Sequence, residues 1–304
     1  MQIRSVLFIV GVLLVCVGAS LVLPLGVSLW YGDGAFLGLL SSLVIMVGGG
    51  LALAYTNRSQ TPLNLTLRDG FAVVGICWIV ASFAGGLPFV LTSTASVTDA
   101  VFEAASGFTT TGATIFADIE GLPHGLLMWR SLTHWIGGLG IILLSLIVLP
   151  LLGVGGMQLY RAEVTGPSPD KLTPRMQDTA LTLWRVYCLM TIVLTVLLYI
   201  AGMDWFDALN HSFSTVATGG FSTKNNSIAA YPQASIQWIL IFFMFIAGIN
   251  FSLHAQALRG VVKVYLRDRE CRFYTVLLIL GSAVIVAGLV EHGLFGMRSF
   301  SEFE

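Results

Sequence analysis

Charged side chains are scarce in this sequence. Asp, Glu, Lys and Arg make up only 10% of the 304 residues, whereas an ordinary soluble domain contains roughly 25%. This scarcity excludes soluble globular, disordered and nucleic-acid-binding proteins. The four cysteines show no CxxC pair and no metal-type spacing, so we expect inert thiols. The GxSxG and HExxH motifs and a phosphate-binding loop are also missing, so the sequence predicts neither an enzyme nor direct nucleotide binding.

Long apolar runs dominate the chain instead. About 20 apolar residues are needed to cross a bilayer as a helix, so a run of this length predicts a membrane span. The sequence contains seven such runs, at 5–30, 35–56, 71–92, 127–152, 180–201, 236–258 and 273–291. The first run is too long for the apolar core of a signal peptide and lacks a small-x-small cleavage site. We therefore predict an all-α polytopic membrane protein that keeps this first span.

Basic residues fall unevenly on the connections between these spans. Only Lys224, Arg298 and Arg130 fall on one side of the membrane. The other side receives Arg4, Arg58, Arg68, Arg161, Lys171, Arg175, Arg185, Arg259, Lys263, Arg267, Arg269 and Arg272. Because loops rich in Lys and Arg stay in the cytoplasm, this asymmetry predicts a cytoplasmic N-terminus. The basic stretch at 259–272 is also expected to contact anionic membrane lipid.

The chain contains an internal repeat. A shift of 108 positions aligns residues 99–112 with residues 207–220 without a gap. Each segment lies on the predicted outer side and opens with a half-apolar stretch of about ten residues, which is too short to span. Each ends in a part rich in Thr and Gly, which we name the first strip (109–112) and the second strip (217–220). Each unit is thus predicted to be a span, a short re-entrant helix, a strip and a second span, an arrangement typical of transporters.

The N-terminal ends of the short helices are expected to be capped, and their C-terminal ends to face a cation. Thr98 or Asp99 is expected to cap the start of the first helix, and Asp207 the start of the second. A ten-residue helix covers about 15 Å, so a helix that enters from the outer face ends near the middle of the membrane. The partial negative charge of its C-terminus there favours a cation.

The strips then return outward as irregular backbone. Such backbone is tolerated at this depth only in a protein-lined or watery cavity. Gly112, Gly219 and Gly220 permit the positive φ angles that turn carbonyl groups inward, and rings of carbonyl groups form the filters of potassium channels. The alternative is an ordinary extracellular turn, since Thr and Gly are common in turns. The repeat favours the filter.

Four stretches carry a family resemblance: SGFTTTGAT (106–114), WIGGLGII (135–142), LGVGGMQLYRAE (152–163) and GGFST (219–223). With them the chain resembles the TrkH/TrkG/KtrB superfamily of potassium uptake proteins, and it is most similar to the bacterial TrkH branch. The resemblance implies four joined two-span units, similar to those of a potassium channel, around one pore. It also implies two extra N-terminal helices and uptake of K⁺ across the bacterial cytoplasmic (inner) membrane, with no cofactor besides the transported ion.

The resemblance also assigns sites and partners. The implied selectivity filter consists of Thr110, Thr111, Gly112, Thr218, Gly219 and Gly220. The implied division of the chain is 1–68 for the extra helices, 69–175 and 176–270 for two repeats, and 271–304 for the opening helix of a third. The implied partners are a cytoplasmic nucleotide-binding ring subunit of the TrkA type and, in the full-length family, a second copy in a homodimer.

The chain departs from the family in its length. A third re-entrant helix would begin near position 315, beyond Glu304. Two loops do not supply the about eight oxygens that four loops offer a potassium ion. Either the chain is a fragment, or a second chain completes the pore, and the odd number of predicted spans favours the fragment. A non-conducting assembly subunit is the alternative function.

Several polar residues and glycines keep two interpretations each. Glu103 and His211 occupy equivalent positions in the two repeats and could form a proton pair, but a structural role on the back of each short helix, near the outer water, is favoured. For His134, Asn250 and His254 we expect packing or interhelical hydrogen bonds rather than ion relay. For the glycines of the WIGGLG motif, close helix packing is favoured over gating. These are Gly137, Gly138 and Gly140.

Overall fold

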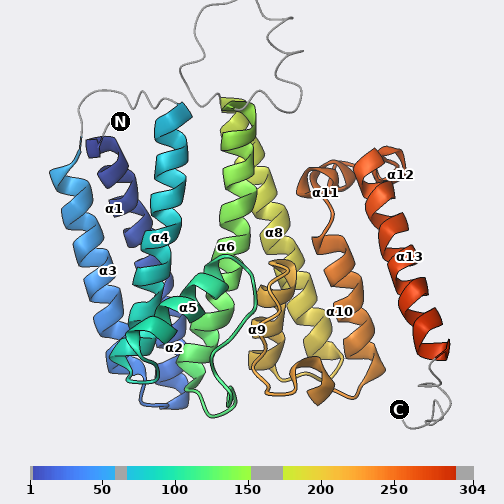
Figure 1. Ribbon diagram of the computed structural model, residues 1–304, viewed down its shortest axis with the longest axis horizontal. Helices are drawn as coiled ribbons and strands as arrows, with labels where there is room; N and C mark the ends of the chain where they lie inside the picture. The colour runs from blue at the N-terminus through green and yellow to red at the C-terminus, as the bar shows by residue number, and fades with distance from the viewer. Residues whose placement is uncertain (1–2, 59–66, 152–173, 292–304) are drawn as a thin grey trace, which may run out of the picture.

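The computed structural model describes residues 3–58, 67–151 and 174–291, which form a bundle of helices (Figure 1). No strand occurs in these three ranges, in agreement with the predicted all-α class. The helices are α1 (Ile3–Ser20), α2 (Val22–Tyr31), α3 (Phe36–Thr56), α4 (Leu67–Leu91), α5 (Val97–Phe108), α6 (His124–Leu151), α8 (Pro174–Ile200), α9 (Trp205–Val216), α10 (Ala234–Ala247), α11 (Phe251–Leu258), α12 (Val264–Arg267) and α13 (Arg269–Glu291). The motif at 152–163 lies outside the described residues.

Most of the predicted spans are present. Five helices are long and apolar enough to cross a membrane, namely Ile3–Tyr31, Phe36–Thr56, Gly70–Leu91, Asp178–Ile200 and Arg269–Leu289. The first of them is α1 continued by α2. The predicted span at 127–152 coincides with α6, whose 28 residues are also enough to cross at about 1.5 Å per residue.

The predicted span at 236–258 is wrong as a single helix. It consists of α10 and α11, which are bent by 101° relative to each other. The helix ends at Ala247, and Asn250 starts α11 by accepting a hydrogen bond from the backbone N–H of Ser252 at 3.0 Å. An asparagine in this position satisfies an N–H group that a new helix would otherwise leave unpaired. In Figure 1, α11 lies across the upper end of α10 instead of continuing it.

The two short helices of the repeat are α5 and α9, with 12 residues each. In Figure 1 both lie towards the lower end of the bundle, beside the long helices of their own units. The predicted caps are wrong, because both helices begin earlier than expected. Ser96 caps α5 by accepting from the N–H of Asp99, and Asp204 caps α9 by accepting from the N–H of Phe206. Asp207 lies in the first turn of α9 and makes other contacts.

α6 is fixed on both sides by hydrogen bonds to its neighbours. The indole of Trp129 donates to the carbonyl oxygen of Gly85 in α4 at 2.9 Å. On the opposite side, the indole of Trp135 donates to Thr191 Oγ1 at 3.0 Å, and the hydroxyl of Tyr187 donates to the carbonyl of Trp135 at 3.0 Å. These hydrogen bonds attach α6 to α4 on one side and to α8 on the other.

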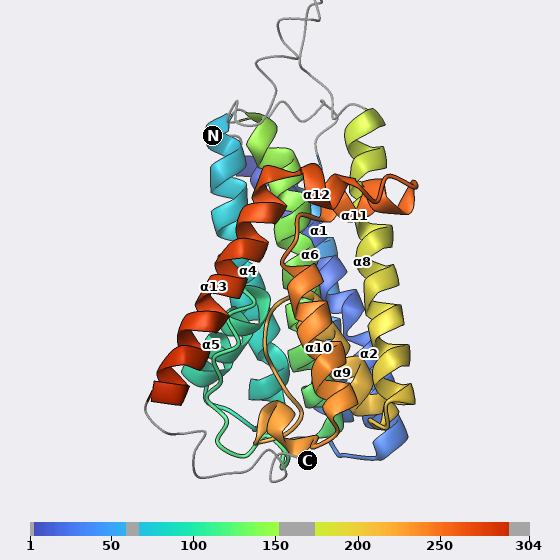
Figure 2. The same ribbon diagram turned by 90° about the vertical axis from the view of Figure 1, so that its right-hand side faces the viewer.

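α13 stands at the edge of the bundle, as Figures 1 and 2 show from two directions. None of its apolar window is buried. It is held near its N-terminal end, where Tyr274 stacks on Phe245 of α10 with ring centroids 5.6 Å apart. Its apolar surface thus faces outward along most of its length.

Candidate functional site: the two threonine–glycine strips

The backbones of the two strips follow the same course. In the first, the N–H groups of residues 109, 110 and 111 donate to the carbonyls of residues 105, 107 and 106. In the second, residues 217, 218 and 219 donate to residues 213, 215 and 214, which is the same pattern shifted by 108 positions. The internal repeat of the sequence is therefore also a repeat of backbone structure.

Positive φ angles recur at equivalent positions. Thr110 and Thr218 both have φ of 55°, while Gly112 has 78° and Gly220 has 90°. A residue other than glycine rarely has a positive φ, because this conformation strains the backbone. Backbone strain is often found at functional sites. The expectation was right for Gly112 and Gly220 but wrong for Gly219, whose φ is not positive.

Gly219 is a glycine for reasons of space. A Cβ atom there would lie 2.1 Å from Nδ1 of His134, whose ring is fully buried in α6. Nδ1 also lies 3.1 Å from the hydroxyl of Ser214 in α9. His134 therefore packs against the second strip, which agrees with the predicted packing role.

The strips meet each other and the middle of α6. A Cβ atom on Gly112 would lie 2.1 Å from the carbonyl oxygen of Gly219. A Cβ atom on Gly137, near the middle of α6, would lie 1.9 Å from the carbonyl oxygen of Phe108, the last residue of α5. One on Gly138 would lie 3.0 Å from Cα of Ala217. α5 and α9 thus end halfway along a spanning helix, as the sequence predicts.

Glu103 and His211 make equivalent contacts. Both carboxylate oxygens of Glu103 accept from the hydroxyl of Thr114 at 3.0 Å. Nε2 of His211 lies 3.0 Å from the hydroxyl of Ser222, which is the equivalent position in the second repeat. Each side chain holds the segment that follows its strip, which agrees with a structural role, but both are almost fully buried instead of meeting the outer water.

The segment after the second strip is also held by Asp207. Its carboxylate accepts hydrogen bonds at 2.7 Å from Thr223 and from Tyr231, and Lys224 Nζ lies 3.4 Å away. Burial by itself raises the pKa of Asp207, but the hydrogen bonds from Tyr231 and Thr223 and the charge of Lys224 hold that pKa below its ordinary value. An ionised carboxylate therefore fixes this segment to α9.

The loops that follow the two strips are joined through Asn225. Its Oδ1 accepts from the N–H of Ile119 at 2.6 Å, and its Nδ2 donates to Asp118 at 3.1 Å. The N–H of Asn225 donates to Glu120, also at 3.1 Å. Nothing in the sequence pattern indicated these contacts, because the partners are more than 100 positions apart.

The chemistry offered by the strips is that of oxygen donors. Backbone carbonyls and threonine hydroxyls are oxygen ligands, which suit a hard cation. Within the three described ranges, no group of three or more His, Cys, Asp or Glu side chains could hold a metal ion.

The family model described as "TrkH: Cation transport protein" matches residues 40–291. The chain belongs to the TrkH family. This confirms the resemblance on which the sequence expectations depend.

Similar proteins include the Trk system potassium uptake protein TrkH of Escherichia coli (strain K12), which is 42% identical over 278 residues, or 90% of this chain and 57% of that protein. The protein of the same name from Halomonas elongata is 43% identical over 293 residues, or 95% of this chain and 60% of that protein. The crystal structure of the potassium transporter TrkH from Vibrio parahaemolyticus matches with a TM-score of 0.89 and 36% identity, covering 100% of this chain and 62% of that one. The chain thus spans about three fifths of the length of these TrkH proteins.

Proposed function

We propose that this chain takes part in potassium uptake across the bacterial cytoplasmic membrane and that the two strips form part of the ion filter. The filter residues would be Thr110, Thr111, Gly112, Thr218, Gly219 and Gly220. The observation that supports this most is the matched backbone of the two strips where they meet beside the middle of α6. Two helix C-termini end there, and each carries a partial negative charge that stabilises a cation.

The proposed division of the chain follows the same repeat. Residues 1–68 would be the extra helices, 69–175 and 176–270 the two repeats, and 271–304 the start of a third. In the described residues, α4, α5 and α6 form the first unit and α8, α9, α10 and α11 the second. Their matching order supports this division.

The charge distribution supports a cytoplasmic N-terminus. Arg259, Lys263 and Arg267 lie on or beside α11 and α12, at the upper end of the bundle in Figure 1, whereas α5 and α9 lie towards the lower end. Basic residues concentrate on the cytoplasmic side of membrane proteins. This end is accordingly the proposed contact for anionic lipid and for a nucleotide-binding subunit of the TrkA type, and the complete protein would be a homodimer.

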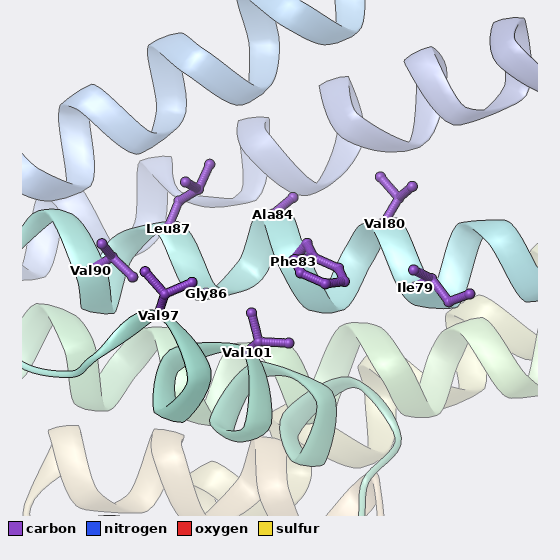
Figure 3. Close-up of a pocket in the computed structure, with 9 residues that line it drawn as sticks. All are labelled: Ile79, Val80, Phe83, Ala84, Gly86, Leu87, Val90, Val97 and Val101. Carbon is purple, nitrogen blue, oxygen red and sulfur yellow. The ribbon is translucent and has the colours of Figure 1, made fainter.

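The alternative is a non-conducting fragment or an assembly subunit that needs a second chain to complete the pore. An apolar groove of about 480 Å³ between α4 and α5 offers a packing surface for such a chain, as it does for lipid (Figure 3). The groove is lined by Ile79, Val80, Phe83, Ala84, Gly86, Leu87, Val90, Val97 and Val101. No polar side chain lines this groove, so the face suits an apolar neighbour and not an ion.

The test is growth at limiting potassium, with rubidium uptake, in a bacterium that lacks its own potassium uptake systems. One strain expresses these 304 residues, and another expresses them joined to the remaining part of the E. coli relative. We expect rescue by the joined chain. Failure of the joined chain, although it is present in the membrane, would refute the proposal. Rescue by the short chain alone would show that copies of it complete a pore.

A further inference from the structure

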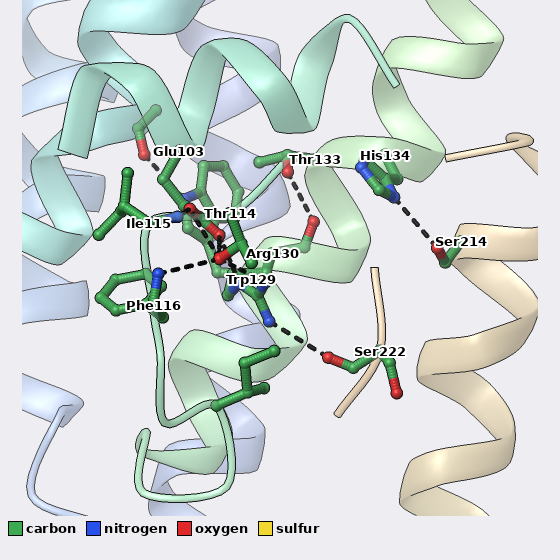
Figure 4. A network of polar contacts seen from close by, with 12 residues as sticks. Glu103, Thr114, Ile115, Phe116, Trp129, Arg130, Thr133, His134, Ser214 and Ser222 are labelled. Carbon is green, nitrogen blue, oxygen red and sulfur yellow. Dashed lines mark hydrogen bonds and ion pairs between the residues drawn. The ribbon is translucent and has the colours of Figure 1, made fainter. Parts of the chain in front are cut away.

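Arg130 of α6 is almost completely buried and lies between Thr114 and Ser222, which follow the two strips (Figure 4). Its Nε donates to Oε1 of Glu103 at 2.7 Å, and Nη2 donates to the hydroxyl of Thr114 at 3.2 Å. Its Nη1 donates to the carbonyl oxygen of Ser222 at 3.2 Å. Thr114 and Ser222 are equivalent positions, 108 apart. One guanidinium group therefore holds both segments that follow the strips.

The same face of α6 also holds the residue directly after Gly220. The ring of Phe221 lies 4.3 Å from the guanidinium carbon of Arg130 and stacks on His134 at 4.0 Å, with the planes 14° apart. Arg130 and His134 are four positions apart, so they lie on one side of the helix. The aromatic ring is thus clamped between two side chains of α6.

We propose that Arg130 is a positioning residue that sets the spacing between the two strips and thereby the discrimination between potassium and sodium. This inference rests on the proposed filter function. An ion filter tells cations apart through the placement of its carbonyl groups. The planar guanidinium has five donors in a fixed fork, which constrains direction as well as distance.

Simple stabilisation does not account for this arrangement. A buried ion pair contributes little net stability, because removing two charges from water offsets most of their attraction. At the equivalent contact of the second repeat, His211 holds Ser222 through a hydrogen bond without an ion pair, and the Asp207–Lys224 pair of that repeat is partly exposed. The arginine is needed where a single group must reach both repeats at once.

The experiment uses the joined chain described above. Arg130→Lys keeps the charge but loses the fork, and we expect about a tenfold loss of rubidium preference over sodium, since one hydrogen bond to a charged group is worth roughly that factor. Thr191→Val is the control, because it removes a partly buried hydrogen bond between α6 and α8 that does not touch the strips. Unchanged discrimination in Arg130→Lys, with uptake still measurable, would overturn the inference.

If Arg130→Lys yields too little protein, a charge-reversed pair distinguishes an effect on ion preference from an effect on folding. The double variant Glu103→Arg with Arg130→Glu restores an ion pair, but its guanidinium starts from α5 and Glu cannot donate to the Ser222 carbonyl. We expect recovery of protein in the membrane without recovery of ion preference. Recovery of both would mean that the pair acts only in folding.

A second readout is independent of transport. The apparent melting temperature of the purified joined chain in KCl is compared with that in NaCl. A potassium-specific increase in the unsubstituted chain that Arg130→Lys loses supports the inference, and an increase that persists in Arg130→Lys refutes it. If the unsubstituted chain shows neither this increase nor uptake, the proposed function itself fails.

Discussion

Gly112 and Gly219 bring the two strips into backbone contact. A Cβ atom on Gly112 would lie 2.1 Å from the carbonyl oxygen of Gly219, a distance at which the backbone itself must move. Gly112 also has a positive φ. The contact joins residues from two different repeats, so any side chain at Gly112 disturbs both.

Gly112→Ala and Gly220→Ala form a matched pair of substitutions. Both positions have positive φ, but nothing lies within 4 Å of a Cβ atom on Gly220. A left-handed conformation costs an alanine about 1–2 kcal/mol, and overpacking at Gly112 adds about 1–3 kcal/mol. We expect Gly112→Ala to lose more folded protein and more rubidium uptake, as measured by gel filtration of tagged protein and by uptake rates. Equal losses in the two variants would contradict the backbone contact.

The repeat made much of this site predictable. The matching segments at 99–112 and 207–220 led to two short helices that end at mid-membrane, because a short apolar stretch cannot span. The glycine requirement at Gly112 and Gly220 followed from the same comparison. These conclusions depend on local length and composition, which a sequence reports directly.

Contacts between distant residues could not be predicted in this way. Arg130 was used only as an orientation signal, although an arginine within a predicted span itself indicates a functional site. Its partners are 27 and 92 positions away. The break between α10 and α11 was missed because the mean hydropathy of 236–258 stays high across Asn250. The break depends on a capping bond from this one side chain, which an average over many residues does not report.

Asp207 makes the stability of the second repeat depend on pH. Its pKa in the folded protein lies below the ordinary value of 3.8, so the ionised form stabilises the fold above that value. This contribution is lost as the pH falls through the folded pKa. We expect the melting temperature to fall on acidification below about pH 4, and less steeply in Asp207→Asn.

The matched control is Asp99→Asn, since Asp99 is the equivalent residue of the first repeat and is exposed. The melting temperature of this variant, followed over the same pH range, is the reference for the loss of one exposed carboxylate. If the melting temperature falls with pH equally steeply in Asp207→Asn and in Asp99→Asn, other carboxylates determine the acid sensitivity.

Gly137→Ala and Gly140→Ala are expected to change stability in opposite directions. A Cβ atom on Gly137 would lie 1.9 Å from the carbonyl oxygen of Phe108, whereas Gly140 has open space around it. The first substitution should destabilise by about 1–3 kcal/mol or more through overpacking. The second should stabilise by up to about 1 kcal/mol, because alanine favours helix more than glycine does. Thermal unfolding in detergent measures both, and destabilisation by Gly140→Ala would contradict the open position.

The cost of a side chain at Gly219 is expected to come from one neighbour, the ring of His134. The φ of Gly219 is not positive, so alanine meets no backbone strain there, and its Cβ would lie 2.1 Å from the imidazole. Gly219→Ala should therefore lose most of the folded protein, and His134→Ala should lose part of it through the lost contacts with Phe221 and Ser214. In the double variant the ring is gone, so the double variant should be destabilised by less than the sum of the two single destabilisations. A double-mutant cycle on the melting temperature tests this, and strict additivity would mean that the second strip is displaced by something other than the histidine.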